Sequence, residues 1–397
     1  MTSLPLGGVR VVDLSRVLAG PFAAALLGDL GADVVKVEDP AGGDEARTWA
    51  PQKDGESPGY VVNNRNKRAI AVDLKRSEGP EIVRRLAGDA DVLVENFRTG
   101  AMEEFGLGYG TLAALNPRLV YCSVSAFGRT GPRAREAGYE AVMQAFGGVM
   151  SITGEPGGEP VRCGLSFVDL TTGILCALGV LAALRMRERT GRGQRVDGSL
   201  LETAVGLLNY HAQSYLLTGE RPRPLGSSHP SLAPYRNYRC RDDQWIFIAG
   251  ANDRLWRRLV GAIGLERLLE DPRFATNLDR VRHRQELDRL VEEATARVDR
   301  DDLLRRLAEA AIPAAAVNRV DQVLEDPQTR SRPLMRRMRH PKLGDIPVLG
   351  LPLEFSAMDP GVRRHAPALG EHTDEILAEL GYSATETAEL RVRGVVA

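Results

Sequence analysis

The sequence predicts an α/β fold: a Rossmann-like large domain with a mostly parallel sheet, joined to a smaller α+β domain. Three observations support this prediction. Short apolar runs typical of buried parallel strands alternate with helical patterns as far as residue 125. The chain has 397 residues, which is more than one ordinary hydrophobic core accommodates. A stretch rich in proline, glycine and serine, residues 221–234, then separates this region from segments of a different pattern.

The first strand–helix–strand unit is expected at the beginning of the chain. Residues 9–14 (VRVVDL) and 34–38 (VVKVE) are compact apolar runs. Between them, residues 22–30 repeat apolar side chains every four positions, with Pro21 suited to the first helical turn and Gly31 to the helix end. The alternation continues with strands at 69–74, 91–95 and 119–125 and helices at 78–87 and 111–115. It predicts a doubly wound sheet.

The second half of the chain changes character. Helical patterns cover residues 170–188 and 199–217, and paired strands at 237–241 and 245–249 follow the linker. Charged helices within 254–311 and a strand at 314–317 complete the smaller domain, and a helix start at Thr373 returns the chain to the large one. The expected organisation is a large Rossmann-like domain in two parts, 1–220 and 351–397, with linkers at 221–234 and 331–350 and the small domain at 235–330.

Composition narrows the range of partners. The net charge of −1 argues against nucleic acid, and the four scattered cysteines contain no CxxC pair that would indicate zinc or a redox dithiol. The first residues lack the apolar core of a signal peptide. The longest apolar run, residues 174–184, is shorter than the roughly 20 residues that a bilayer requires. We therefore expect a cytoplasmic protein without membrane contact.

Several common site types are absent from the sequence. The first strand is followed by SRVLAGP, whose single glycine does not make the G-x-G-x-x-G turn of nicotinamide enzymes, so Glu38 is interpreted as a strand-end residue. The six histidines form no HExxH or HxH pattern, and no G-x-S-x-G occurs. No metal site is expected. Of the histidines, His229 in the glycine- and proline-rich linker is the candidate for a functional role.

Asp169 stands out because it is an acid within the otherwise apolar stretch 161–172, VRCGLSFVDLTT. A buried carboxylate is costly unless it is paired or hydrogen-bonded. Two interpretations remain open from the residues alone. Asp169 is either an N-cap or ion-paired structural acid before a helix that starts near Thr171, or a carboxylate nucleophile at a helix start, where exposed N–H groups favour anions.

Motifs along nearly the whole chain resemble those of the family III CoA-transferases, whose relatives include formyl-CoA and carnitine CoA-transferases and α-methylacyl-CoA racemases. The segments that carry the resemblance are RVVDLSRVLAGPFAAALLGDLGADVVKVEDPAGGDEAR, NNRNKRAIAVDLK, DVLVENFRTGAMEEFGLGY, SAFGRTGP, GYEAVMQAFGGVMSITGEP, DLTTGILCALGVLAAL, EDPQTRSR and ALGEHTDEILAELG. Each is weak alone, but the combination and its order are specific.

The resemblance implies a transferase that moves CoA from an acyl-CoA to a carboxylic acid, with the CoA thioester as a substrate and no permanently bound cofactor. Asp169 matches the family's catalytic aspartate, which forms an acyl–aspartyl anhydride and then an aspartyl-CoA thioester. Tyr139 and Glu140 are implied to lie near it, and Gly147–Gly148 is a candidate source of oxyanion donors. The implied CoA-binding residues follow strand ends: Val17, Leu18, Val72, Asp73, Leu74, Lys75, Asn96, Phe97 and Arg98.

The match departs from the family pattern at two places. Glu103 and Glu104 stand where relatives often carry an arginine, so the CoA phosphates are expected to be held by Arg98, Arg47 or a partner subunit. Tyr139 replaces the histidine of the racemases, which favours transfer over racemisation because tyrosine is a poor base near neutral pH. A racemase and a non-catalytic CoA-binding protein remain the alternatives.

The resemblance also implies an interlocked homodimer in which the small domain covers the site. His229 and Arg236 are then expected to approach the acyl group. Basic residues such as Arg236 and Arg239 mildly favour a dicarboxylic acid, with succinyl-CoA as a donor.

Overall fold

The computed structural model describes residues 4–397 of the chain, so the first three residues of the expected large domain lie outside it. The chain forms two compact units. The first contains the described residues up to Val149 together with Cys163–Ala212 and Arg330–Ala397, and the second contains Met150–Arg162 and Gln213–Thr329. The units differ from the domain boundaries expected above, because residues 150–162 and 213–220 fall in the second unit and the expected linker 331–350 falls in the first. Each unit is described below by itself.

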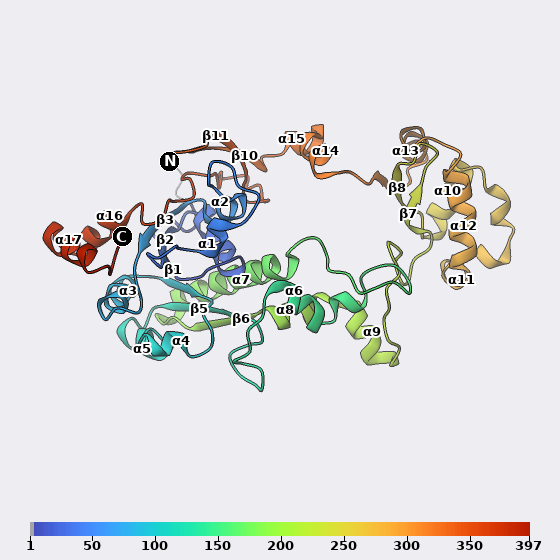
Figure 1. Cartoon of the computed structure of the whole chain (residues 1–397). Coiled ribbons are helices and arrows are strands. Elements are labelled where there is room, and N and C mark those ends of the chain that lie inside the picture. Colours follow the sequence, from blue (N-terminus) through green and yellow to red (C-terminus); the bar gives the residue numbers. More distant parts are fainter. Residues whose placement is uncertain (1–3) are drawn as a thin grey trace. The chain divides into compact units, whose positions relative to one another are not determined.

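The first unit is built on a six-stranded sheet in which every neighbouring pair is parallel, in the order β3-β2-β1-β4-β5-β6 (Figure 1). Its strands are β1 (Arg10–Asp13), β2 (Asp33–Glu38), β3 (Lys67–Ala71), β4 (Val92–Glu95), β5 (Val120–Ser125) and β6 (Arg195–Ser199). The predicted α/β class and the mostly parallel sheet are therefore confirmed. The first five strands match the apolar runs, whereas β6 (RVDGS) is polar and was not predicted from its sequence.

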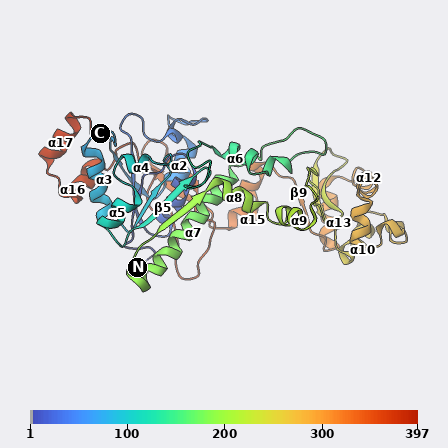
Figure 2. The same ribbon diagram turned by 90° about the horizontal axis from the view of Figure 1, so that it is seen from below.

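Both faces of the sheet are covered because successive strand residues point to opposite sides. Val11 packs with α1 and α7 in one cluster, while its neighbour Val12 packs with α3, α5 and α16 in another. In Figure 2, β5 lies between α5 and α7. The helices of this unit are α1 (Ala19–Asp29), α2 (Pro58–Asn64), α3 (Glu78–Gly88), α4 (Ala101–Glu104), α5 (Tyr109–Leu115), α6 (Glu140–Phe146), α7 (Phe167–Thr190), α8 (Leu200–Leu207), α16 (Thr373–Glu379) and α17 (Ala384–Val392).

The strand order reverses direction between β1 and β4. Consecutive strands run from β1 outward to β3, and the chain then returns to place β4 on the other side of β1. In open α/β sheets the loops that follow the two strands at such a point diverge and leave a crevice. The loops after β1 and β4 are therefore the first place to look for a ligand site.

Helix α7 is longer than its sequence pattern indicated. The apolar pattern predicted residues 170–188, but the helix begins at Phe167 and ends at Thr190, and the next residue, Gly191, adopts the left-handed conformation. In the part of the chain that the structure describes, α7 is the one helix long and apolar enough to cross a membrane, and half of that apolar window is buried. Buried core helices meet the same criterion.

Two further segments differ from their sequence patterns. The predicted helix over 199–217 is two helices, α8 and α9 (Tyr210–Thr218), because Asn209 has a positive φ of 42° and interrupts the helical hydrogen bonds. The expected linker 331–350 contains an antiparallel hairpin, β10 (Met335–His340) and β11 (Gly344–Leu349), preceded by α15 (Pro327–Ser331). Met338 and Val348 of this hairpin pack against Val61 of α2.

The second unit combines a small antiparallel sheet with helices around Trp256 and Phe274. Its strands β7 (Tyr235–Arg239), β8 (Trp245–Ala249) and β9 (Ala314–Ala316) confirm the predicted α+β character. Its helices are α10 (Asp253–Ala262), α11 (Asn277–Arg282), α12 (Arg284–Thr295), α13 (Arg300–Glu309) and α14 (Val320–Glu325).

Candidate active site

A cavity of about 570 Å³ opens beside the carboxyl ends of β1, β4 and β5 in the first unit, at the point where the strand order reverses. It joins residues that lie far apart in the sequence. Eight residues that the sequence predicted for the site line this cavity: Val17, Leu18, Asn96, Phe97, Arg98, Tyr139, Glu140 and Asp169.

Asp169 reaches the cavity from the first turn of α7. It is the third residue of that helix, where backbone N–H groups have no intrahelical acceptor and favour a negative charge. The residue is only 8% exposed, and within residues 4–397 its side chain makes no hydrogen bond or ion pair. Burial, and then the charge of Glu140, raise the pKa of Asp169 to about 7. The interpretation of Asp169 as an N-cap or ion-paired structural acid is therefore wrong.

Glu140 is placed by the start of α6 and is almost fully buried. Gln144, one turn later, donates its side-chain N–H to Glu140 Oε1 at 2.6 Å. The Gln144 Oε1 atom accepts from the Cys163 N–H at 2.9 Å, and so connects α6 to the segment that leads into α7. This contact holds the elements carrying Glu140 and Asp169 together. Tyr139, the N-cap of α6, is 61% exposed and lines the same cavity.

The loop after β1 is held in an unusual backbone conformation. Val17 has a φ of 72°, which a β-branched residue rarely adopts. Its N–H donates to Asp44 Oδ1 at 3.0 Å, and Asp44 is paired with the fully buried Lys36, whose Nζ also donates to the Ser15 carbonyl. A buried ion pair between Lys36 and Asp44 thus fixes the loop.

Asn96, in the loop after β4, fixes the same loop from the other side. Its Oδ1 accepts from the Arg16 N–H at 2.8 Å, and its Nδ2 donates to the Arg16 carbonyl at 2.6 Å. These two bonds couple the loops that flank the reversal of strand order. The guanidinium of Arg16 lies 4.8 Å from the centre of the Phe97 ring.

The model of the CoA-transferase family III matches residues 6–373.

The chain belongs to the CoA-transferase family III.

Relatives that are named as CoA-transferases match it over most of their length. The succinate–glutarate CoA-transferase of Agrobacterium fabrum is 40% identical, over 95% of this chain and 96% of that protein. The human succinyl-CoA:glutarate CoA-transferase is 37% identical, over 99% of this chain and 90% of the human one. A crystal structure of a CaiB/BaiF family protein from Brucella suis superposes with a TM-score of 0.86 at 42% identity, over 96% of this chain and all of the other.

One of the phosphate-binding expectations for this CoA-transferase needs correction, the one that names Arg47. Arg47 is engaged inside the protein: it pairs with Glu38 and donates to the Tyr60 hydroxyl and the Pro367 carbonyl, so it does not face the cavity. The same pair explains Glu38, which is an internal ion-pair partner and not a ribose ligand. Arg98 does line the cavity but pairs with Glu104.

The remaining expected CoA and acyl contacts of the transferase are not lining residues of this cavity. Val72, Asp73, Leu74 and Lys75 follow the carboxyl end of β3, where Val72 is buried and bridges to Val396. His229 and Arg236 belong to the second unit. There the His229 ring packs against Tyr235, and Arg236 pairs with Asp288 at 3.4 Å.

One expected oxyanion donor is already used. The Gly147 N–H donates to the Met143 carbonyl at 2.8 Å, as part of the end of α6. The N-terminal N–H groups of α7 are the candidate donors nearest in sequence to Asp169.

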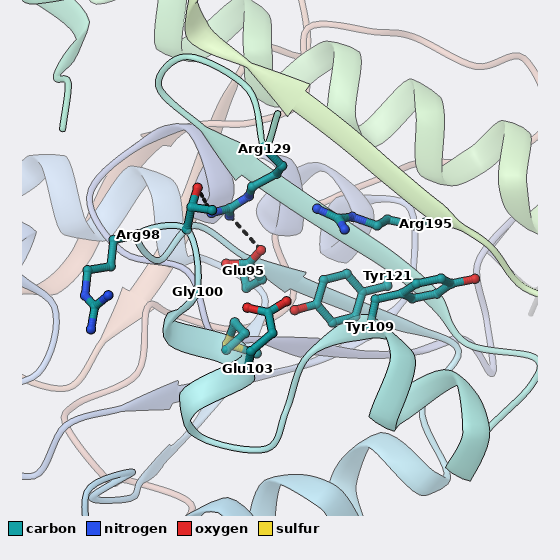
Figure 3. Close-up of a pocket in the computed structure, with 10 residues that line it drawn as sticks. Glu95, Arg98, Gly100, Glu103, Tyr109, Tyr121, Arg129 and Arg195 are labelled. Atoms are coloured by element: carbon teal, nitrogen blue, oxygen red, sulfur yellow. Dashed lines mark hydrogen bonds and ion pairs between the residues drawn. The ribbon is translucent and has the colours of Figure 1, made fainter. Parts of the chain in front are cut away.

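Sequence reasoning missed three arginines that line the cavity: Arg16, Arg129 and Arg135. Arg16 adjoins Val17 in the loop after β1, so the search for residues that follow strand ends could have found it. Arg129, by contrast, is recognised only from its contacts. It donates to Glu95 Oε1 and to the Phe97 carbonyl, each at 2.7 Å, and so supports the loop after β4 from a smaller neighbouring cavity of about 160 Å³ (Figure 3).

Proposed function

We propose that this CoA-transferase moves CoA from succinyl-CoA to a second dicarboxylic acid, with Asp169 as the covalent nucleophile. One observation carries the proposal. Asp169 is a buried carboxylate that lines a cavity of about 570 Å³ and has no cationic partner in the described chain. A structural carboxylate in such surroundings is ordinarily paired. A nucleophile must instead keep its oxygens free.

The proposed reaction conserves the activated acyl group at each step. Asp169 attacks the thioester carbonyl of the donor, the C–S bond breaks, and an acyl–aspartyl anhydride and CoA thiolate result. The thiolate attacks the Asp169 carbonyl and releases the donor acid, leaving an aspartyl-CoA thioester. The acceptor carboxylate attacks this thioester to give a second anhydride and thiolate. The thiolate then attacks the acceptor acyl carbon, which restores the Asp169 carboxylate.

The electrostatics of the site suit this cycle. Burial and the neighbouring Glu140 destabilise the negative charge on Asp169, as its raised pKa reflects. A carboxylate that is poorly stabilised in the ground state is the more nucleophilic one. The N–H groups at the start of α7 are oriented toward charge that develops at this residue.

CoA is proposed to lie along the loops after β1 and β4. Phe97 offers an aromatic face and Arg16, Arg98 and Arg135 offer guanidinium groups at the same cavity. Val72–Lys75 is proposed to contact the part of CoA that extends beyond the cavity. The preference for dicarboxylic acids rests on the relatives, whose names give succinate, succinyl-CoA, glutarate and D-citramalate as substrates.

A homodimer is proposed from the surface of α7. The face opposite its packed one carries Ile174, Leu175, Leu178 and Met186, each between 49% and 60% exposed. An exposed apolar stripe of this kind is typical of a protein–protein interface. We propose that a second copy of the chain covers it.

Trapping the intermediate tests the nucleophile. Enzyme incubated with succinyl-CoA and then hydroxylamine is digested and analysed by mass spectrometry, with Asp169→Asn as the control. We expect a hydroxamate mass change on the peptide that contains Asp169. An unmodified peptide from enzyme that is turning over would refute the proposal. Incorporation of α-deuterium from heavy water without an acceptor acid would instead indicate racemisation.

A further inference from the structure

A second, strongly basic pocket of about 200 Å³ lies in the first unit, away from the proposed CoA loops. It is formed where the amino end of edge strand β3 meets β10 and the segment before α16. The charged residues that line it are all basic or histidine: Lys67, Arg337, Arg339, Arg363, Arg364, His365 and His372. No aspartate or glutamate is among its lining residues.

The alternation of β10 brings two of these arginines to one face. Met338 and His340 are buried, and Met338 packs against Val61 of α2 and Val348 of β11. Arg337 and Arg339, on the alternate positions, therefore share the exposed face. The hairpin is anchored by its buried face and presents both guanidinium groups on the other.

The second pair of arginines is held by a backbone clamp. Asn66 Oδ1 accepts from the N–H groups of Arg363 and Arg364, at 2.6 and 3.0 Å, and the Asn66 N–H donates to the Arg364 carbonyl. The guanidinium of Arg363 donates to the carbonyls of Gly28 and Asp29, at the end of α1. Its charge is thus fixed in place by backbone carbonyls, near the Asp29 carboxylate but outside ion-pair distance of it.

Within the described residues, Arg337, Arg339 and Arg364 meet no acid, whereas the Lys67 ammonium pairs with Asp13 at 2.8 Å and His365 pairs with Glu371. Within residues 4–397, no carboxylate oxygen lies within 4 Å of the side-chain nitrogens of Arg337, Arg339 or Arg364. Asp345 stands opposite Arg339 in the hairpin register but lies beyond that distance. The other acids nearby are engaged, Glu371 with His365 and both Glu375 and Glu379 with Arg68.

We infer that this pocket binds a phosphate-class anion carrying at least two negative charges. Like charges held this close repel one another, and an anion in their midst removes the repulsion. Guanidinium groups match the geometry of phosphate oxygens in paired hydrogen bonds, and a phosphate has enough oxygens to meet several of them at once. The volume admits one or two phosphate groups. Free pyrophosphate and the diphosphate of a nucleotide share this chemistry.

This site is separate from the one proposed for CoA. Lys67 begins β3, whereas Val72–Lys75 follow its carboxyl end, about 16 Å away along an extended strand. The large cavity and the basic pocket have no lining residue in common. The inference therefore does not depend on the proposed function.

Calorimetric titration of the full chain tests the inference. Sodium pyrophosphate, orthophosphate and ADP are titrated into the protein with and without saturating CoA. The test variant is Arg337→Gln/Arg339→Gln, and the control is Arg282→Gln/Arg305→Gln, which changes the net charge equally on exposed helices of the second unit. Arg364→Gln is a second test variant outside the hairpin.

We expect one pyrophosphate per chain, undisturbed by CoA and weakened about tenfold or more in both test variants but not in the control. If ADP also binds, with the same loss in the test variants and no effect of CoA, the natural ligand is a nucleotide. If ADP does not bind, the natural ligand is free diphosphate. The inference is overturned if wild-type protein binds none of the anions, or if CoA displaces them. It is equally overturned if the test variants change the oligomeric state while anion binding is absent, since acids of a second copy would then be the occupant.

Discussion

The charge of Glu140 raises the pKa of Asp169, and the two buried carboxylates line one cavity although 29 positions separate them in the chain. The start of α6 supplies one and the first turn of α7 supplies the other. Removing one charge should therefore change the titration of the other.

The pH dependence of transfer is the first prediction. A nucleophilic carboxylate must be ionised, so kcat/KM should rise with pH through a limb near pH 7. Glu140→Gln keeps an oxygen for the Gln144 N–H but removes the charge, and should move the limb to lower pH. The shift should be partial, because burial is the larger cause of the raised pKa. Glu188→Gln, at the far end of α7, should leave the limb in place.

The stability of the protein should also depend on Asp169. Its folded pKa of about 7 exceeds the ordinary value of 3.8, so the folded state binds more protons between these values. The free energy of unfolding therefore loses a contribution as pH rises from 4 to 7. Asp169→Asn should be more stable than wild type at pH 8, by at most about 4 kcal/mol, and equal to it below pH 4. Urea unfolding at both pH values measures this, and an equal stability at pH 8 would contradict it.

Asp44 should control the loop that carries Val17. Asp44→Ala removes the acceptor of the Val17 N–H and leaves Lys36 buried without its partner, at a cost of about 3 kcal/mol in unfolding free energy. Asp44→Asn keeps an acceptor for the N–H and loses only the charge. We expect both to melt earlier, and the alanine variant to show the larger rise in KM for acyl-CoA. Equal KM values in the two variants would mean that the loop does not depend on this hydrogen bond.

The ion pair between Arg98 and Glu104 offers a gain-of-affinity test. Both side chains are largely exposed, so the pair itself contributes little to stability. Glu104→Gln releases Arg98 and should lower KM for succinyl-CoA about two- to fivefold if the guanidinium meets a CoA phosphate. Glu103→Gln makes the same charge change one residue earlier, without an ion pair to Arg98, and serves as control. An equal effect of both variants would assign the change to overall charge.

The exposed face of α7 should determine the oligomeric state. Leu178→Glu places a charge in the middle of the apolar stripe, where Leu178 is 60% exposed in the single chain. We expect sedimentation equilibrium to show a dimer for wild type and a shift toward monomer for the variant. Arg189→Glu, on the same helix beyond the stripe, is the matched control.

The first strands and helices could be predicted in order, because each one has a local apolar pattern that the sequence itself contains. Val11 and Val12 are both apolar because both faces of β1 are buried, and such runs identify parallel strands without any knowledge of neighbours. Asp169 was likewise visible from its apolar context. Strand β6 was not predicted, because it is an edge strand whose alternate residues are exposed and it therefore lacks a continuous apolar run.

The sequence by itself determined the α/β class, the family motifs and the candidate nucleophile, since these depend on residue types at short spacing. Only the tertiary structure decided which loops meet, because strand order sets β1 beside β4 and so joins Arg16 to Asn96. It also decided that Arg47 pairs with Glu38 and Arg98 with Glu104, while Arg337 and Arg339 meet no acid within residues 4–397. Whether a charged side chain is free is a property of its neighbours in space, and the order of the residues along the chain does not contain it.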